Sequence, residues 1–135
     1  MQIKQIYRGL FLGGIASLQL LISLECLAKE IKVLALGDSL IAGYGLAENQ
    51  HFTTQLQKTL KNEGYNVSLI NAGVSGDTSA GGLTRLDWSL ASGPDAVILE
   101  LGANDGLRGI SPSTTKRNLE RILDQLRIKE IPVLF

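Results

Sequence analysis

The chain has 135 residues, in which 13 lysines and arginines balance 13 aspartates and glutamates. This length suits one domain with a modest hydrophobic core. The balanced charge provides no basic surface, so the sequence gives no support for nucleic-acid binding. Cys26 is the single cysteine and has no second thiol in the chain with which to form a disulfide.

The first 28 residues have the pattern of a secretory signal peptide. Lys4 and Arg8 precede an apolar run over 9–24, and Ala28 ends a short segment of the kind that a signal peptidase recognises. We expect cleavage after Ala28, a periplasmic or secreted protein, and no stable membrane span once the signal is removed. The alternative is an uncleaved anchor, although the run is short for a bilayer, which needs about 20 apolar residues.

Apolar runs that predict strands alternate with amphipathic stretches that predict helices along residues 29–135. The expected strands cover 31–36, 65–71, 95–101 and 131–135. The expected helices cover 48–64, a stretch that opens at Thr78 and a stretch that opens at Ser111. This alternation indicates βαβ crossovers, hence an α/β protein with a parallel sheet and helices on both faces.

Apolar residues recur at helical spacing in each of the three expected helices. The stripes are Phe52, Leu56 and Leu60 in the first helix, Leu83, Leu86 and Leu90 in the second, and Leu119, Ile122, Leu123 and Leu126 in the third. Trp88 falls off the stripe of its helix, and we expect it to cover an edge of the core.

Three successive strands are followed by polar, glycine-bearing turns. These turns carry Ser39, Gly73 and Asn104. Because the carboxyl ends of parallel strands share one edge of the sheet, a hydroxyl, a glycine N–H and an amide can converge there. Acyl transfer needs such a nucleophile together with donors aimed at the developing oxyanion.

The same turns carry three sequence blocks in order. The blocks are Gly37-Asp38-Ser39-Leu40, then Asn71-Ala72-Gly73 with Ser75-Gly76-Asp77-Thr78, then the Glu-Leu-Gly-Ala-Asn-Asp-Gly-Leu-Arg-Gly segment at 100–109. Over about 32–135 the chain resembles the GDSL, or SGNH, hydrolases, and it is most similar to the periplasmic branch with thioesterase, arylesterase and lysophospholipase activity.

The resemblance implies a fold, a reaction and a set of site residues. The implied fold is the flavodoxin-like three-layer α/β/α arrangement of SGNH hydrolases, and the implied substrate is a small acyl ester or thioester. Ser39 would be the nucleophile. The N–H of Ser39, the N–H of Gly73 and the side chain of Asn104 would form the oxyanion hole, with no metal or cofactor.

The chain departs from the family pattern at the general base. The family supplies the base in an Asp-x-x-His block near its C-terminus, and no such block precedes Phe135. His51 is the single histidine, and we expect it on the surface of the first helix. We therefore expect 29–135 to be the N-terminal part of a truncated, impaired hydrolase domain. The alternative is a non-catalytic domain of the same fold that binds acyl or glycan ligands.

A third hypothesis uses the aspartates of the same turns. Asp38, Asp77 and Asp105 could gather around a divalent cation, as carboxylates at strand ends do in metal-dependent phosphohydrolases and receiver-type domains. The glycines and Asn104 would then have no role. Taken one at a time, we expect Asp38 to stabilise its turn, Asp77 to open a helix and Asp105 to bond loop amides.

Overall fold

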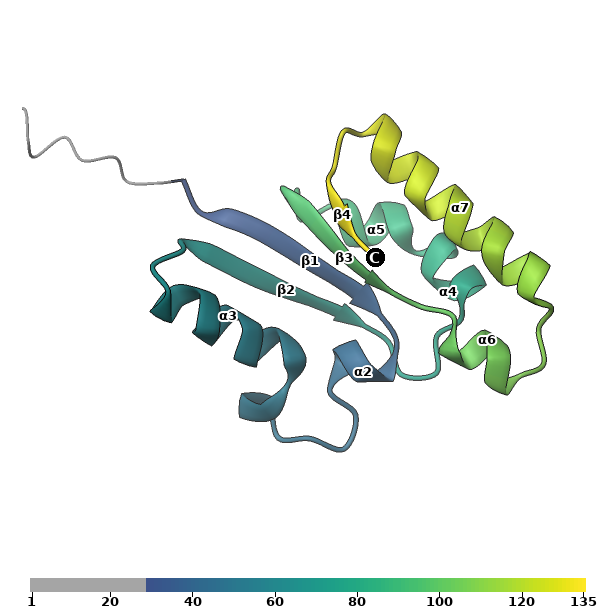
Figure 1. Cartoon of the computed structure of the whole chain (residues 1–135), viewed down its shortest axis with the longest axis horizontal. Helices are drawn as coiled ribbons and strands as arrows, with labels where there is room; N and C mark the ends of the chain where they lie inside the picture. Colours follow the sequence, from purple (N-terminus) through teal and green to yellow (C-terminus); the bar gives the residue numbers. More distant parts are fainter. Residues whose placement is uncertain (1–28) are drawn as a thin grey trace, which may run out of the picture.

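The structure is a computed structural model that describes residues 29–135, so the expected signal peptide at 1–28 lies outside the described residues. Its centre is a four-stranded sheet in the order β2-β1-β3-β4, and every strand pair is parallel (Figure 1). The strands are β1 (Ile31–Gly37), β2 (Val67–Gly73), β3 (Ala96–Glu100) and β4 (Val133–Leu134). The parallel α/β sheet predicted from the sequence is confirmed.

Helices cover both faces of the sheet (Figure 1). One face is covered by α3 (Phe52–Asn62), and the other by α4 (Ser79–Thr84), α5 (Leu86–Leu90) and α7 (Pro112–Ile128). Three short helices complete residues 29–135: α2 (Ser39–Ala42), η1 (Glu48–Gln50) and α6 (Ala103–Leu107). Both α2 and α6 directly follow strands, at the edge of the sheet where the parallel strands end (Figure 1).

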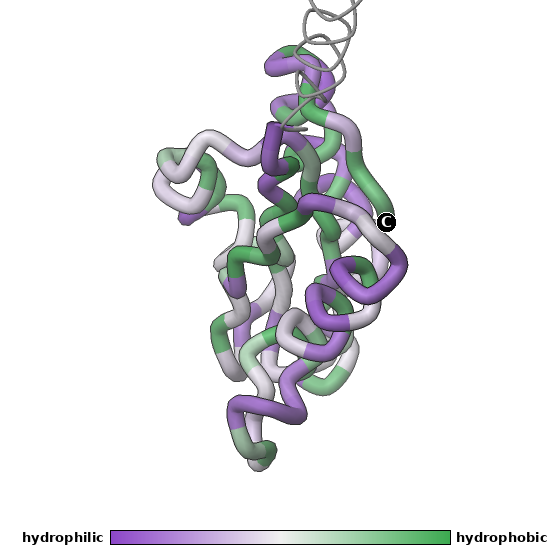
Figure 2. Tube along the Cα trace, turned by 90° about the vertical axis from the view of Figure 1, so that its left-hand side faces the viewer, coloured by the Kyte–Doolittle hydropathy of each residue, from purple (hydrophilic) through white to green (hydrophobic). Residues whose placement is uncertain are grey.

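The main core lies between the sheet and the layer of α5 and α7. Alternate residues of β1 and β3 point into it, as the two-residue period of a strand requires. Its fully buried members are Leu34, Leu36, Leu86, Val97, Leu99, Leu101, Ile122 and Leu126. Hydrophobic stretches run through the middle of the molecule (Figure 2). The predicted stripes of the second and third helical regions are confirmed as core-facing.

Two of the predicted helical regions are divided in the structure. The expected helix 48–64 is a 3-10 turn followed by α3, with His51 between them. The expected helix after Thr78 breaks at Arg85 into α4 and α5. Phe52, predicted to face the core, is 43% exposed. Trp88 is 79% exposed, but it lines a hollow with Leu34, Ile70 and Ala72 at the edge of the core, as expected.

Two segments predicted as loops are short helices. Residues after Ser39 form α2 because the Asp38 side chain caps the first turn by accepting a hydrogen bond from the Leu40 N–H at 3.0 Å. Residues after Gly102 form α6. The sequence predicts a turn from Asn71 to Gly73, but this segment continues β2 and pairs with β1 as far as Gly37 opposite Gly73.

The chain changes direction around β1. From β1 it crosses by α3 to β2 on one side, and from β2 it crosses by α4 and α5 to β3 on the other side. The carboxyl end of β1 is therefore the point where the strand order reverses. Open α/β sheets form their ligand crevices at such a point, because the two crossovers leave on opposite faces. Ser39 follows this end of β1 directly.

None of the helices in residues 29–135 has the length and apolar character that crossing a bilayer requires.

Candidate active site

Ser39 is the first residue of α2 and is joined to Asn104 through the carboxylate of Asp38. The Asp38 side chain is 2% exposed; its Oδ1 accepts from the Ser39 hydroxyl at 3.4 Å, and its Oδ2 accepts from Asn104 Nδ2 at 2.9 Å. Two residues 65 positions apart in sequence are thus held by one buried group. The expected role of Asp38 in stabilising its own turn is confirmed by its bond from the Leu40 N–H.

Two groups at Ser39 and Asn104 each have an N–H that can still donate a hydrogen bond. The Ser39 N–H stands at the first position of α2, where a helix provides no internal acceptor. The Asn104 amide group carries two N–H bonds, and Asp38 uses one of them. A backbone N–H and a side-chain N–H on two neighbouring strand ends are the kind of donors that stabilise an oxyanion.

The N–H of Gly73, predicted as an oxyanion donor, has a hydrogen-bond partner within the chain. Its N–H donates to its neighbour Asn71 Oδ1 at 2.9 Å, while Asn71 Nδ2 donates to the Ile41 carbonyl at 2.8 Å. A Cβ added at Gly73 would lie 2.1 Å from the backbone nitrogen of Ala42. Gly73 is therefore needed for the close approach of α2 to β2, and its N–H is already engaged.

A second glycine of the same loop offers a free N–H. Gly76 lies in a turn closed by a bond from the Asp77 N–H to the Val74 carbonyl at 3.0 Å, and its φ is +79°. Its carbonyl accepts from Arg108 Nη2 at 2.7 Å, and within residues 29–135 its N–H has no acceptor. The sequence pattern includes Gly76 in the second block without indicating that it is a donor; the positive φ that this turn requires is the signal that distinguishes it.

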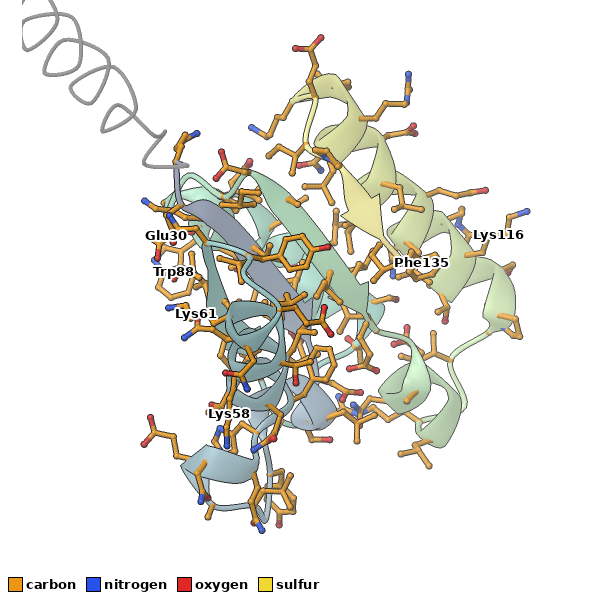
Figure 3. All side chains as sticks on the ribbon, turned by 60° about the vertical axis from the view of Figure 1, so that its left-hand side comes forward. Glu30, Lys58, Lys61, Trp88, Lys116 and Phe135 are labelled. Carbon is orange, nitrogen blue, oxygen red and sulfur yellow. The ribbon has the colours of Figure 1, made fainter. Side chains whose placement is uncertain are left out.

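Apolar hollows flank the two helices that carry Ser39 and Asn104. One, of about 400 Å³, lies beside α2, and another, of about 510 Å³, lies between α6 and α7. The first is lined by Leu40, Ile41, Phe52, Ile98 and Glu100, and the second includes Gly102, Gly106, Leu119, Leu123 and Phe135. Figure 3 shows Phe135 beside α7.

A second carboxylate, that of Glu100, contacts the backbone of the Ser39 turn. Its Oε2 accepts from the Asp38 N–H at 3.3 Å. Burial raises the pKa of Glu100 above its ordinary value, and the bond from Asp38 offsets this only in part.

His51 does not act on Ser39 in this arrangement. The ring packs against Gly43, which ends α2 at the opposite terminus from Ser39, and its Nε2 lies 3.3 Å from the Leu46 carbonyl oxygen. His51 stands between η1 and α3 rather than inside a helix. The Ser39 hydroxyl has no imidazole partner among residues 29–135.

The three aspartates of the cation hypothesis have separate partners. Asp77 pairs with Arg85 at 2.7 Å, and Asp105 accepts from the Ser79 N–H at 2.7 Å. Asp38 is bound as described above. In the part of the chain that the structure covers, no three histidine, cysteine or acidic residues are grouped so that they could hold a metal ion. The geometry gives the phosphohydrolase hypothesis no support.

Comparison with known proteins places this geometry among hydrolases. Residues 35–135 match the model of the GDSL-like lipase/acylhydrolase family. The chain is 43% identical over 128 residues to an esterase called TesA from Pseudomonas aeruginosa, covering 94% of this chain and 62% of the relative. It is 41% identical over 96 residues to thioesterase 1/protease 1/lysophospholipase L1 of Escherichia coli, covering 70% of this chain and 45% of the relative.

A solved structure gives the same result for the fold. AlinE4, an SGNH-hydrolase family esterase, is 44% identical and superposes with a TM-score of 0.76 over 80% of this chain and 59% of its own. The chain therefore spans about half to three fifths of the length of the relatives it matches.

Proposed function

Because the chain belongs to the GDSL-like lipase/acylhydrolase family, we propose that the complete protein hydrolyses acyl esters or thioesters with the Ser39 hydroxyl as nucleophile. The observation that carries the proposal is the chain of contacts from the Ser39 hydroxyl through the Asp38 carboxylate to the Asn104 amide. It stands at the carboxyl end of β1, where the strand order reverses.

The reaction proceeds in two acyl transfers. Ser39 Oγ loses its proton to a general base and bonds to the substrate carbonyl carbon, and the carbonyl oxygen becomes an oxyanion. The oxyanion collapses, the alcohol or thiol leaves with the proton, and an acyl group remains on Ser39. Water, deprotonated by the same base, then releases the carboxylic acid and restores the hydroxyl. The base lies outside residues 29–135, since these residues bring no imidazole to Ser39.

Three donors bind the oxyanion in this proposal. Two are the Ser39 N–H and the Asn104 Nδ2, as expected from the sequence. For the third donor, the N–H of Gly73 is the weaker candidate. It must break its hydrogen bond to Asn71 Oδ1 before it can donate to the oxyanion. The Gly76 N–H, which has no acceptor among the described residues, is the better one.

The acyl character of the substrate is supported by the hollow beside α2, whose lining is aliphatic and aromatic apart from Glu100. Apolar hollows of this kind favour acyl or aryl groups over phosphates. The esterase and thioesterase names of the relatives agree with this substrate class.

We further propose a periplasmic or secreted location, based on the signal-peptide pattern at 1–28. N-terminal sequencing of the exported protein should begin at residue 29, and a protein that keeps its first 28 residues in the cytoplasm would contradict the proposal.

Measuring turnover distinguishes a hydrolase from a domain of the same fold that only binds its ligand. This alternative arises because no imidazole contacts Ser39 in residues 29–135. The complete protein should hydrolyse p-nitrophenyl butyrate and a short acyl thioester with burst kinetics, because an acyl-enzyme forms before water attacks. Product release can be followed by absorbance after rapid mixing. Binding of a radiolabelled fatty acyl ester with no product over hours would favour the binding domain instead.

A further inference from the structure

Arg85 connects the ends of the two strands that lead into the proposed site. It lies at the break between α4 and α5, and its side chain is only 17% exposed. Its Nη2 donates to the Gly37 carbonyl at 3.0 Å, and its Nη1 donates to the Ala72 carbonyl at 2.8 Å. Its Nε donates to Asp77 Oδ2 at 2.7 Å. One guanidinium therefore contacts three separate segments of the chain.

Each of these acceptors is a near neighbour of a proposed site atom. The Gly37 carbonyl stands two residues before Ser39. The Ala72 carbonyl lies in the last residues of β2, just before the loop that carries Gly76, and Asp77 follows Gly76 directly. A planar guanidinium directs its N–H bonds at fixed angles in one plane, so the positions of its acceptors are set relative to one another. A lysine ammonium has no such fork.

The two carbonyls stand where regular pairing of the strands ends. The Gly37 carbonyl also accepts from the Val74 N–H at 3.0 Å, which folds the loop after β2 back onto β1. A partly buried carbonyl needs a donor, and the guanidinium provides one to each strand end. Arg85 stands at the break between α4 and α5 and reaches both carbonyls from there.

We infer that Arg85 is a positioning residue, which sets the spacing between the Ser39 turn and the Gly76 N–H by fixing the carboxyl ends of β1 and β2. The inference rests on the proposed function for its effect on turnover. Donors that stabilise only the transition state must match the place where the oxyanion forms, and a displacement of about 1 Å can cost about 100-fold in rate.

The test is Arg85→Lys in the complete protein. The variant keeps the charge beside Asp77 but replaces three donor nitrogens held in one plane by a single nitrogen, which does not reproduce the guanidinium bonds to both carbonyls and to Asp77. We expect kcat for p-nitrophenyl butyrate to fall about 10- to 100-fold while KM changes less than about threefold, because the lost alignment acts on the transition state rather than on substrate binding. The amide resonances of Val74 and Gly73 should also shift in ¹H–¹⁵N spectra.

Two controls separate positioning from general destabilisation. Arg127→Lys makes the same exchange in an exposed pair with Asp124 on α7 and should leave kcat unchanged. Ile122→Val removes a methyl group from the buried face of α7 and so lowers the free energy of unfolding. It should also leave kcat unchanged when the variant is assayed below its melting temperature. If Arg85→Lys matches the wild-type kcat, or loses only what Ile122→Val loses, the inference is overturned.

The spectra keep this inference distinct from the proposed function. If the wild-type protein hydrolyses no ester, the proposed function fails, but shifted Val74 and Gly73 resonances in Arg85→Lys still support Arg85 as the residue that fixes the strand ends. Unchanged resonances would refute that role whether or not the protein is an enzyme.

Discussion

Replacing Ser39 by alanine should lower kcat of the complete protein about 10⁴- to 10⁶-fold, the loss that follows when a serine hydrolase is deprived of its nucleophile. Stability should change little, because the hydroxyl of Ser39 makes only a long contact of 3.4 Å with Asp38. The measurement is turnover of p-nitrophenyl butyrate, together with covalent labelling by a fluorophosphonate, which reacts with an activated serine. Labelling should disappear in Ser39→Ala.

Ser92→Ala provides the matched control. Ser92 is exposed after α5, and its hydroxyl donates only to the Ser89 carbonyl, so the same loss of one oxygen occurs away from the site. Its turnover and labelling should equal those of the unchanged protein. If Ser39→Ala keeps a tenth of the activity, or is still labelled, Ser39 is not the nucleophile.

Replacing Asp105 by alanine should lower the free energy of unfolding by about 3 kcal/mol, since it leaves several buried donors without an acceptor. The Asp105 carboxylate is 1% exposed and accepts from the Ser79 N–H, the Ser79 hydroxyl and the Thr115 hydroxyl. Asn118 extends the network by donating to the Ser79 hydroxyl at 3.0 Å. The network ties α6, which carries Asn104, to α4 and α7, and urea denaturation measures its loss.

The same substitution has a pH signature. Burial alone would raise the pKa of Asp105, but bonds from the Ser79 hydroxyl and amide and from Thr115 outweigh it and hold the pKa below its ordinary value. The stabilisation is therefore fully present above the unfolded pKa of about 3.9 and is lost as pH falls through the lower folded pKa. The difference between wild type and Asp105→Ala should shrink in this acid range.

Asp124→Ala is the control for this prediction. Asp124 pairs with Arg127 on the exposed side of α7, and such surface pairs contribute roughly 0–1 kcal/mol. A stability loss in Asp105→Ala no larger than that of Asp124→Ala would mean that the buried network does not hold the three helices together. A loss that stayed constant from neutral to acid pH would contradict the protonation argument.

The sheet could be predicted because each strand has a recognisable pattern within its own few residues. The continuous apolar run of β1 and the similar run of β3 identify buried parallel strands without any knowledge of their neighbours. The short helices α2 and α6 could not be predicted in this way, because helical periodicity is read over windows of 11 residues or more. The break between α4 and α5 at Arg85 could not be predicted either, since Arg85 bonds there to the Ala72 and Gly37 carbonyls, which are distant in sequence.

Sequence reasoning identified the pair Ser39 and Asn104 from the order of the strand ends, and the structure joins them through Asp38. It selected Gly73 because Gly73 ends the Asn-Ala-Gly turn, but whether an N–H is free depends on the rotamer of Asn71, which sequence does not reveal. The distinction between Gly73 and Gly76 therefore required the loop conformation.

The central claim is that Ser39, Asn104 and the loop of Gly76 surround one oxyanion. The most direct measurement compares ¹H–¹⁵N spectra of the complete protein before and after its phosphonylation by an alkyl fluorophosphonate, whose phosphoryl oxygen stands in for the oxyanion. We predict downfield shifts of the Ser39 and Gly76 amide protons and of one Asn104 side-chain proton, with the Gly73 amide proton still bonded to Asn71. Unmoved Ser39 and Asn104 protons in the labelled protein would contradict the account.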